Sequence, residues 1–157
     1  MSNALTVNAP EGQPFVTFER EFDAPVAAVF RAHQDPELAK QWLAPEGYEM
    51  VIDRYDFATA GAYRYLHKND GEEYAFNGVY HVVRENDLTI QTFEFEGFPD
   101  VVTMETNRFI DLGNGRTRIE GQSTFPSLEA RDGMIESGME VGIAESYDKL
   151  DGVLAAS

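Results

Sequence analysis

The chain has 157 residues, of which 43% are hydrophobic and none is cysteine, so disulfides and thiolate chemistry are excluded. Twenty-eight acidic against twelve basic side chains give a formal charge of −16, which disfavours binding to nucleic acid and to anionic membranes. The first fourteen residues have neither a basic start nor an apolar run. A secretory signal is therefore not expected, and we predict a cytoplasmic protein.

The N-terminal part of the sequence predicts a tail, a strand and two short helices. Residues 1–14 contain two prolines and a glycine, which is typical of a flexible tail, and one domain is expected over 15–156. "FVTFEREF" at 15–22 alternates apolar and polar side chains, as a half-buried strand does. A helix is expected after Asp23, and a second over 35–42 with Asp35 as its N-cap.

The middle of the chain, residues 48–125, predicts an antiparallel meander. Runs of β-branched and aromatic residues are separated by short turn segments, among them Asn69-Asp70-Gly71 and Gly113-Asn114-Gly115. These turn residues tolerate the positive φ that tight hairpins require. Ser127 is a candidate cap for the helical region that follows, and Gly133 is expected to separate a short helix from a long one.

A long C-terminal helix is predicted over about 138–155. Its apolar residues recur three or four positions apart on one stripe, at Met139, Ile143, Tyr147, Leu150 and Leu154. Gly138 and Gly142 lie on one face of this helix, where each interior glycine costs about 1 kcal/mol relative to alanine. Either the helix backbone closely approaches the sheet or a ligand there, or space is left open.

Several stretches, in this order and spacing, resemble the SRPBCC superfamily, which has the START-like, helix-grip fold. They are "FEREFDAPVAAVFRA" (18–32), "WLAPEGYEM" (42–50), "DGEEYAFNGVYHVV" (70–83), "IQTFEFEGFP" (90–99), "GNGRTRI" (113–119) and "RDGMIESGMEVGIAESYDKLDGVLA" (131–155). The similarity is greatest to the branch related to the activator of heat-shock-protein-90 ATPase. It implies an α+β fold in which a curved antiparallel sheet wraps around a long C-terminal helix, with two short helices after the first strand.

Two departures from that branch fall where a cavity is expected. The chain has Ala60-Gly61-Ala62 where the family often has a Gly-Gly pair, and Ile143 where a tryptophan often follows the second helix glycine. A relative's ligand therefore does not transfer to this chain.

Strand alternation and the helix stripe nominate the walls of a ligand cavity between helix and sheet. The candidates are Trp42, Tyr63, Tyr65, His67, Phe76, Tyr80, Gln91, Phe93, Glu105, Asn107, Met139, Gly142, Ile143 and Ser146. Aromatic walls with a few polar groups are typical of small-molecule sites, although they also describe the core of a curved sheet. Trp42 alternatively anchors its short helix.

The sequence contains no metal-binding, phosphate-binding or dinucleotide motif and no nucleophile with an evident base, so no metal and no cofactor are expected. We therefore expect a non-enzymatic protein that binds a small hydrophobic or aromatic molecule. Two alternatives remain open. One is a polyketide cyclase- or dehydratase-like enzyme with Glu105 as acid or base, as in some superfamily relatives, and the other is a partner of a chaperone ATPase, as the family name implies.

Overall fold

The computed structural model describes residues 3–156, and within them all eight strands belong to one antiparallel sheet. The strand order is β1-β2-β8-β7-β6-β5-β4-β3. The strands are β1 (Thr6–Asn8), β2 (Phe15–Phe22), β3 (Glu49–Tyr55), β4 (Ala62–Asn69), β5 (Glu72–Arg84), β6 (Leu88–Phe95), β7 (Val102–Gly113) and β8 (Arg116–Thr124). The helices are α1 (Val26–Gln34), α2 (Pro36–Ala39), α3 (Leu128–Glu136) and α4 (Met139–Ala155).

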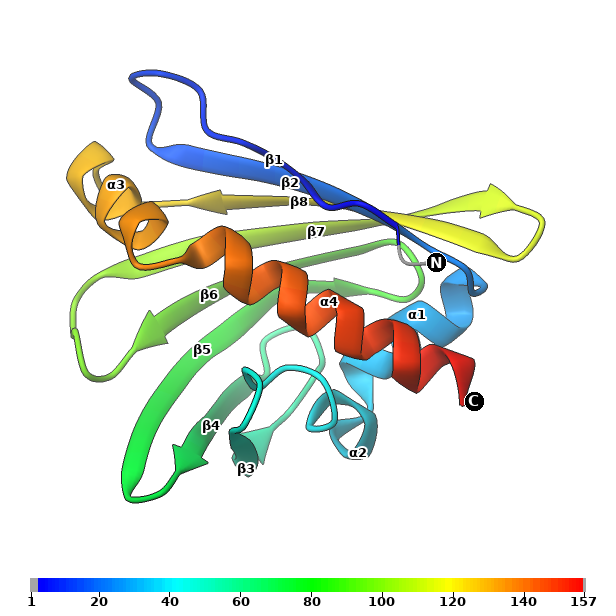
Figure 1. Cartoon of the computed structure of the whole chain (residues 1–157), viewed down its shortest axis with the longest axis horizontal. Coiled ribbons are helices and arrows are strands. Elements are labelled where there is room, and N and C mark those ends of the chain that lie inside the picture. The colour runs from blue at the N-terminus through cyan, green and yellow to red at the C-terminus, as the bar shows by residue number, and fades with distance from the viewer. Residues whose placement is uncertain (1–2, 157) are drawn as a thin grey trace.

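The long helix α4 crosses the inner face of the curved sheet, with α1 and α2 beside its C-terminal end (Figure 1). The predicted α+β architecture and helix-grip fold are therefore confirmed. None of the helices within residues 3–156 is long and apolar enough to cross a membrane.

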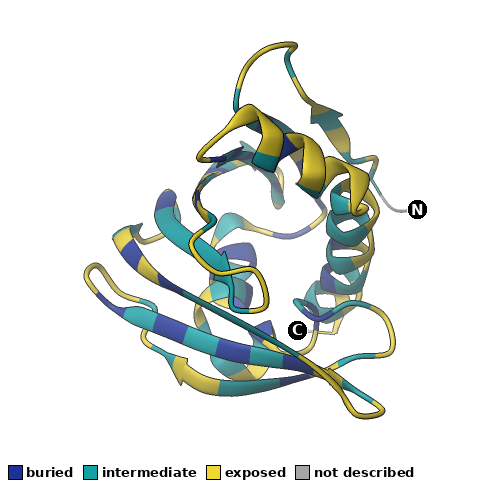
Figure 2. Ribbon diagram, turned by 90° about the vertical axis from the view of Figure 1, so that its left-hand side faces the viewer, coloured by how far each residue is buried: buried dark blue, intermediate teal, exposed yellow. Residues whose placement is uncertain are grey.

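The strands follow the predicted period of two, and buried and half-buried residues alternate along them (Figure 2). The predicted turns also form. Asp70 and Gly71 have φ of 44° and 87°, and Asn114 and Gly115 have φ of 54° and 72°, the left-handed conformations that tight hairpins use. The hairpin residues thus fix the register that places one set of side chains on the inner face.

The N-terminal segment differs from its prediction. Residues 6–8, expected within a flexible tail, form β1 and pair with residues 17–19 of β2. Asp23 does not cap α1; its carboxylate pairs with Arg116 at 2.9 Å, and Pro25 occupies the N-cap position. Asp35, in contrast, caps α2 as predicted by accepting a hydrogen bond from the Glu37 amide.

The break between the two C-terminal helices also lies elsewhere than predicted. Gly133 is inside α3, and the chain turns at Gly138, whose φ is +96°. Ser127 caps α3 as predicted, by accepting a hydrogen bond from the Ala130 amide. Gly138 is therefore a turn residue rather than a costly glycine inside the helix, since only glycine adopts this conformation readily.

Buried apolar residues form two clusters on the inner face. The larger cluster joins α1 and the C-terminal half of α4 to β2, β7 and β8, and contains Phe22, Phe30, Trp42, Phe109, Ile119, Tyr147 and Leu150 among others. The smaller cluster covers β3, β4 and β5 and contains Ala44, Met50, Tyr63, Tyr65 and Tyr80. Only Tyr147 and Leu150 of α4 are buried, so its C-terminal half anchors the helix.

A buried arginine joins α4 to the sheet. The Arg20 side chain is 1% exposed, and its guanidinium contacts both oxygens of Asp151, at 2.8 and 2.6 Å, and one oxygen of Asp148 at 3.0 Å. The same guanidinium lies 4.7 Å from the Phe22 ring centroid. Because a buried guanidinium needs paired acceptors to offset its lost hydration, this contact fixes where α4 crosses β2.

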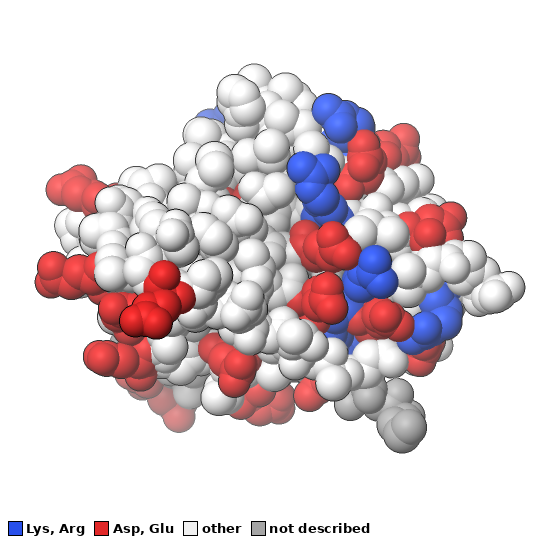
Figure 3. Space-filling model, turned by 90° about the horizontal axis from the view of Figure 1, so that it is seen from above, with Lys and Arg blue, Asp and Glu red and all other residues white. Residues whose placement is uncertain are grey.

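The outer face of the sheet carries ion pairs instead of a core. Arg116 and Arg118 of β8 contact Glu21 of β2 at 2.9 and 3.9 Å, and Figure 3 shows acidic and basic side chains interleaved in a band on one part of the surface. Exposed pairs of this kind contribute little stability each, so the inner face carries the packing that holds the fold together.

Asp151→Asn should destabilise the protein by about 2–3 kcal/mol, because it leaves the Arg20 guanidinium buried with its bidentate partner neutralised. Asp148→Asn is the matched control, because that side chain is 62% exposed, and it should cost less than about 1 kcal/mol. Urea unfolding of both variants measures the difference. Equal losses would contradict the role given to Asp151.

Gly142 and Gly138 should respond in opposite directions to alanine. A Cβ at Gly142 meets no atom within 4 Å, so Gly142→Ala should stabilise the protein by about 0.5–1 kcal/mol through helix propensity. Gly138→Ala should destabilise it by about 1 kcal/mol, because alanine is strained at this positive φ. Thermal unfolding checks both changes, and a destabilised Gly142→Ala would mean that something packs closely against this backbone.

Candidate functional site

A polar row crosses the centre of the inner face. Strand register places Tyr80 of β5 opposite Gln91 of β6, Gln91 opposite Glu105 of β7, and Glu105 opposite Ser123 of β8. Alternation predicted that Gln91 and Glu105 point inward, and they lie in this row as expected. A carboxyl and an amide at the middle of a sheet facing a helix require hydrogen-bond partners, because burying polar groups is costly.

Glu105 is the only acidic side chain in that row, and two hydroxyls donate hydrogen bonds to it. Ser123 Oγ donates to Glu105 Oε1 at 2.5 Å, and Thr103 Oγ1 donates to Glu105 Oε2 at 2.6 Å. Burial raises the pKa of Glu105, against the two hydrogen bonds, which lower it. The side chain nevertheless keeps part of its accessible surface.

Aromatic rings form a continuous wall beside the polar row. Tyr65 lies 5.8 Å from Tyr63 and 5.6 Å from Phe76 between ring centroids, and Phe76 lies 5.3 Å from Phe93 and 4.8 Å from His67. Gly78 makes room for Tyr63, whose hydroxyl donates to the Thr92 carbonyl across it. The wall thus presents ring faces and edges from three neighbouring strands.

Two buried polar atoms within residues 3–156 lack a hydrogen-bond partner: Nε2 of His67 and Oδ1 of Asn107. Burial and the positive charge of Lys149 lower the pKa of His67 to about 4, so its ring is neutral near neutral pH. Buried polar atoms in native proteins are nearly always paired. These two atoms are therefore unsatisfied polar groups within the part of the chain that the structure describes.

The inner face is covered unevenly. Phe109, Ile119 and Phe22, near the C-terminal half of α4, are at most 4% exposed. Inward-facing residues of the central strands, by contrast, are only half-buried: Phe76, Gln91, Phe93, Glu105 and Asn107. From residue 132 to residue 146 the helical layer contributes no buried side chain. The N-terminal half of α4 therefore leaves accessible surface on the sheet beneath it.

The predicted site residues divide into two groups. The sheet candidates gather on one face as predicted, and Met139, Gly142, Ile143 and Ser146 belong to the half-buried part of α4. Tyr63, Tyr65, Tyr80 and His67 are at most 8% exposed, so they form the buried part of this face. Trp42 lies in the larger core cluster and its indole N–H donates to the Ala32 carbonyl at 3.0 Å, so it anchors α2, as the alternative held.

Sequence reasoning missed three residues of this region. Thr103 and Ser123 hold the Glu105 carboxyl by hydrogen bonds. Lys149 of α4 donates to the Ala44 carbonyl and acts electrostatically on His67. No local pattern marks Lys149, because its neighbours come from residues more than eighty positions earlier in the chain.

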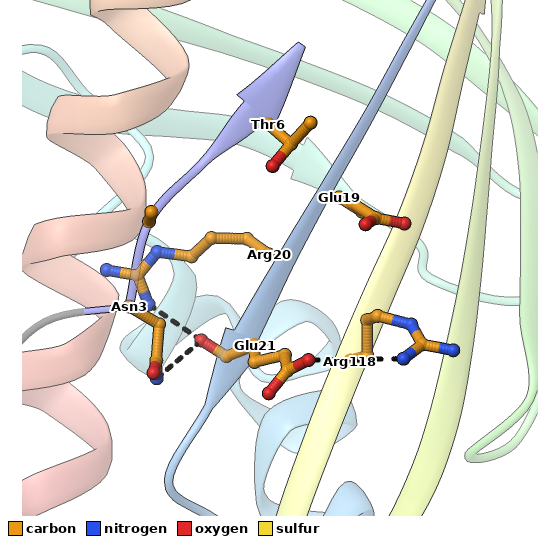
Figure 4. Close-up of a pocket in the computed structure, with 7 residues that line it drawn as sticks. Asn3, Thr6, Glu19, Arg20, Glu21 and Arg118 are labelled. Carbon is orange, nitrogen blue, oxygen red and sulfur yellow. Dashed lines mark hydrogen bonds and ion pairs between the residues drawn. The ribbon is translucent and has the colours of Figure 1, made fainter.

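Two surface depressions lie away from the inner face. One, of about 220 Å³, is bounded by β1 and β2 at Asn3, Glu19, Arg20, Glu21 and Arg118 (Figure 4). The other, of about 590 Å³, is lined mainly by outward-facing residues of β2, β6, β7 and β8, such as Thr17, Ile90, Thr106 and Gln122. Both have polar or mixed linings, and neither lies between α4 and the sheet. No group of three or more metal-ligating side chains occurs within residues 3–156.

Glu105→Gln should change how stability depends on pH. The pKa of Glu105 is raised in the folded protein, so its neutral form is favoured by folding, and its contribution is lost as the pH rises through that raised value. The wild type should therefore lose stability relative to Glu105→Gln over the pH range in which this raised pKa is passed, above the ordinary value of a glutamate. Urea unfolding of both proteins across this range measures the effect, and parallel curves would contradict the assignment.

Solved structures with the same fold come from several bacteria. A Rhodobacter sphaeroides protein is 22% identical, with a TM-score of 0.87 over 98% of this chain and 99% of its own. A Mycobacterium smegmatis protein is 24% identical, with a TM-score of 0.86 over 98% and 99%. An Arthrobacter aurescens protein is 26% identical, with a TM-score of 0.88 over 97% and 92%. A comparison with curated proteins found no match.

The family is shown by the sequence itself. The profile described as "Activator of Hsp90 ATPase homolog 1-like protein" matches residues 23–155. This range runs from the start of α1 to the end of α4 and includes every residue of the polar row and the aromatic wall. The chain therefore belongs to the family of Activator of Hsp90 ATPase homolog 1-like proteins.

Proposed function

We propose that this protein binds a small apolar or aromatic-bearing molecule between α4 and the inner face of the sheet. The supporting observation is the half-buried, aromatic surface of the central strands, together with the unpartnered atoms of His67 and Asn107. A ligand covering this surface would gain roughly 25 cal/mol per Å² of apolar area removed from water. Polar groups at Gln91 and Glu105 would orient it.

The N-terminal half of α4 is the natural wall of such a site. A side chain added at Gly142 has open space in front of it, and Gly142 lies beside the half-buried Met139, Ile143 and Ser146. The Ser146 hydroxyl contacts the Leu43 carbonyl at 3.4 Å, which ties this wall to the segment after α2. The open space at Gly142 supports the second of the two explanations for its presence, namely that volume is left free.

Neutral phenylnaphthylamine, whose fluorescence rises in apolar surroundings, tests the site directly. We expect saturable binding to the wild type and binding at least about tenfold weaker in Gly142→Phe, because the new ring would occupy the proposed volume. Val141→Phe is the matched control, one residue away on a side chain that is 61% exposed, and it should bind like the wild type. Equal losses in both variants, or unsaturable binding to all three proteins, would contradict the proposal.

A second candidate function is proton-transfer catalysis of the cyclase or dehydratase type. It is favoured by one observation: burial raises the pKa of Glu105, which suits a general acid working near neutral pH. Glu105→Gln should then lower turnover of an aryl polyketone substrate by about a hundredfold or more, with phenylnaphthylamine binding unchanged. Steady-state kinetics with the wild type would exclude this candidate if the substrate binds without turnover.

A further inference from the structure

The Glu105 carboxyl has no cationic partner. Within residues 3–156 its hydrogen bonds are those from Ser123 and Thr103, and no ion pair joins it to a basic side chain. Both hydroxyls donate, which leaves the carboxyl an acceptor on each oxygen. A buried carboxylate without a counter-ion is costly, so a positive charge supplied from outside the chain would be strongly favoured at this position.

The basic side chains nearest to α4 already have partners. Arg20 is held by Asp148 and Asp151. Lys149 donates to the Ala44 carbonyl, and its charge acts on His67, at the β4 end of the inner face. The centre of the inner face thus carries an acid to which no basic side chain within residues 3–156 is paired.

The surroundings of Glu105 suit an organic cation. Tyr65, Phe76 and Phe93 present an aromatic wall, and ring faces attract ammonium groups. Asn107 lies two residues from Glu105 on the same face of β7, about 6.6 Å along the strand, and its Oδ1 lacks a donor.

We propose that the ligand of the inner face is an aromatic or apolar amine whose ammonium group pairs with Glu105. This inference rests on the proposed binding function and narrows its ligand class. An anionic ligand would be repelled by Glu105, and a neutral one would leave the carboxyl without a countercharge. The neutral His67 ring and the aromatic wall would contact the ligand's apolar body.

Three probes that share one aromatic body separate these classes: naphthylmethylamine, naphthylmethanol and naphthoate. Isothermal titration at a pH above the raised pKa of Glu105 and below the pKa of the amine measures each affinity. We expect the amine to bind the wild type at least about tenfold more tightly than the alcohol, as a charge-assisted contact in a desolvated site would produce. In Glu105→Gln this preference should fall to within about twofold, because the affinity for the amine falls much more than the affinity for the alcohol.

Glu120→Gln is the matched control, because it removes the same charge from the outer face, where Glu120 pairs with Arg118. It should keep the amine preference, which separates a contact with Glu105 from attraction by the acidic surface as a whole. A preference lost equally in both variants would overturn the inference. The inference would also be overturned if the alcohol or the naphthoate bound the wild type as tightly as the amine. That result would still support the proposed binding site. Binding of none of the three probes would contradict the proposed function itself.

The wild type provides a second measurement that needs no variant. Pairing with an ammonium favours the ionised carboxyl, so amine affinity should rise with pH through the raised pKa of Glu105, whereas alcohol affinity should stay flat or fall. The other titratable groups facing Glu105 are Tyr63 and Tyr65 of β4 and Tyr147 of α4, whose pKa values burial raises above this range. His67 titrates at about 4, below it. An amine affinity that is independent of pH would overturn the inference.

Discussion

Helix α4 is held to the sheet at one end. Tyr147 and Leu150 pack into the larger core cluster. Arg20 of β2 forms ion pairs with Asp151 and Asp148 of α4. At the other end of α4, the turn at Gly138 separates this helix from α3. These three features act on the C-terminal half of α4 or before its start. The half between them contributes no buried residue, although Ile143 packs against the edge of the larger cluster. The rest of the architecture follows from this asymmetric anchoring.

The sheet beneath the unpacked half is built differently from the sheet beneath the anchored half. Where α4 is anchored, Phe22, Phe109 and Ile119 close the core. Where it is not, β6 and β7 present Gln91, Glu105 and Asn107, which a closed core would exclude. A fold that needed only stability could place apolar residues at these positions. In the proposed binding site these polar groups would orient the ligand, and Glu105 would pair with its ammonium group.

The faces of the strands could be read from the sequence, because alternation alone decides which side chains share a side. Gln91, Glu105 and Asn107 were placed inward on that basis, and the structure places them there. The strand at Thr6–Asn8 could not be predicted from the sequence, because three residues carry too little pattern. The Arg20–Asp151 contact joins residues 131 positions apart, and only the folded chain reveals it. The sequence could not decide whether Trp42 lines a cavity or anchors its short helix, because its neighbours come from α1 and α4.

Ligand binding on the inner face requires accessible space between the N-terminal half of α4 and the central strands. The most direct test is two-dimensional NMR of the isotope-labelled protein titrated with neutral phenylnaphthylamine. If the ligand binds there, we expect saturable chemical-shift changes in the side-chain signals of Phe76, Gln91, Phe93 and Asn107. The backbone amides of residues 139–146 should shift as well. Changes confined to the outer face around Thr17 and Gln122, or no saturable change at all, would contradict it.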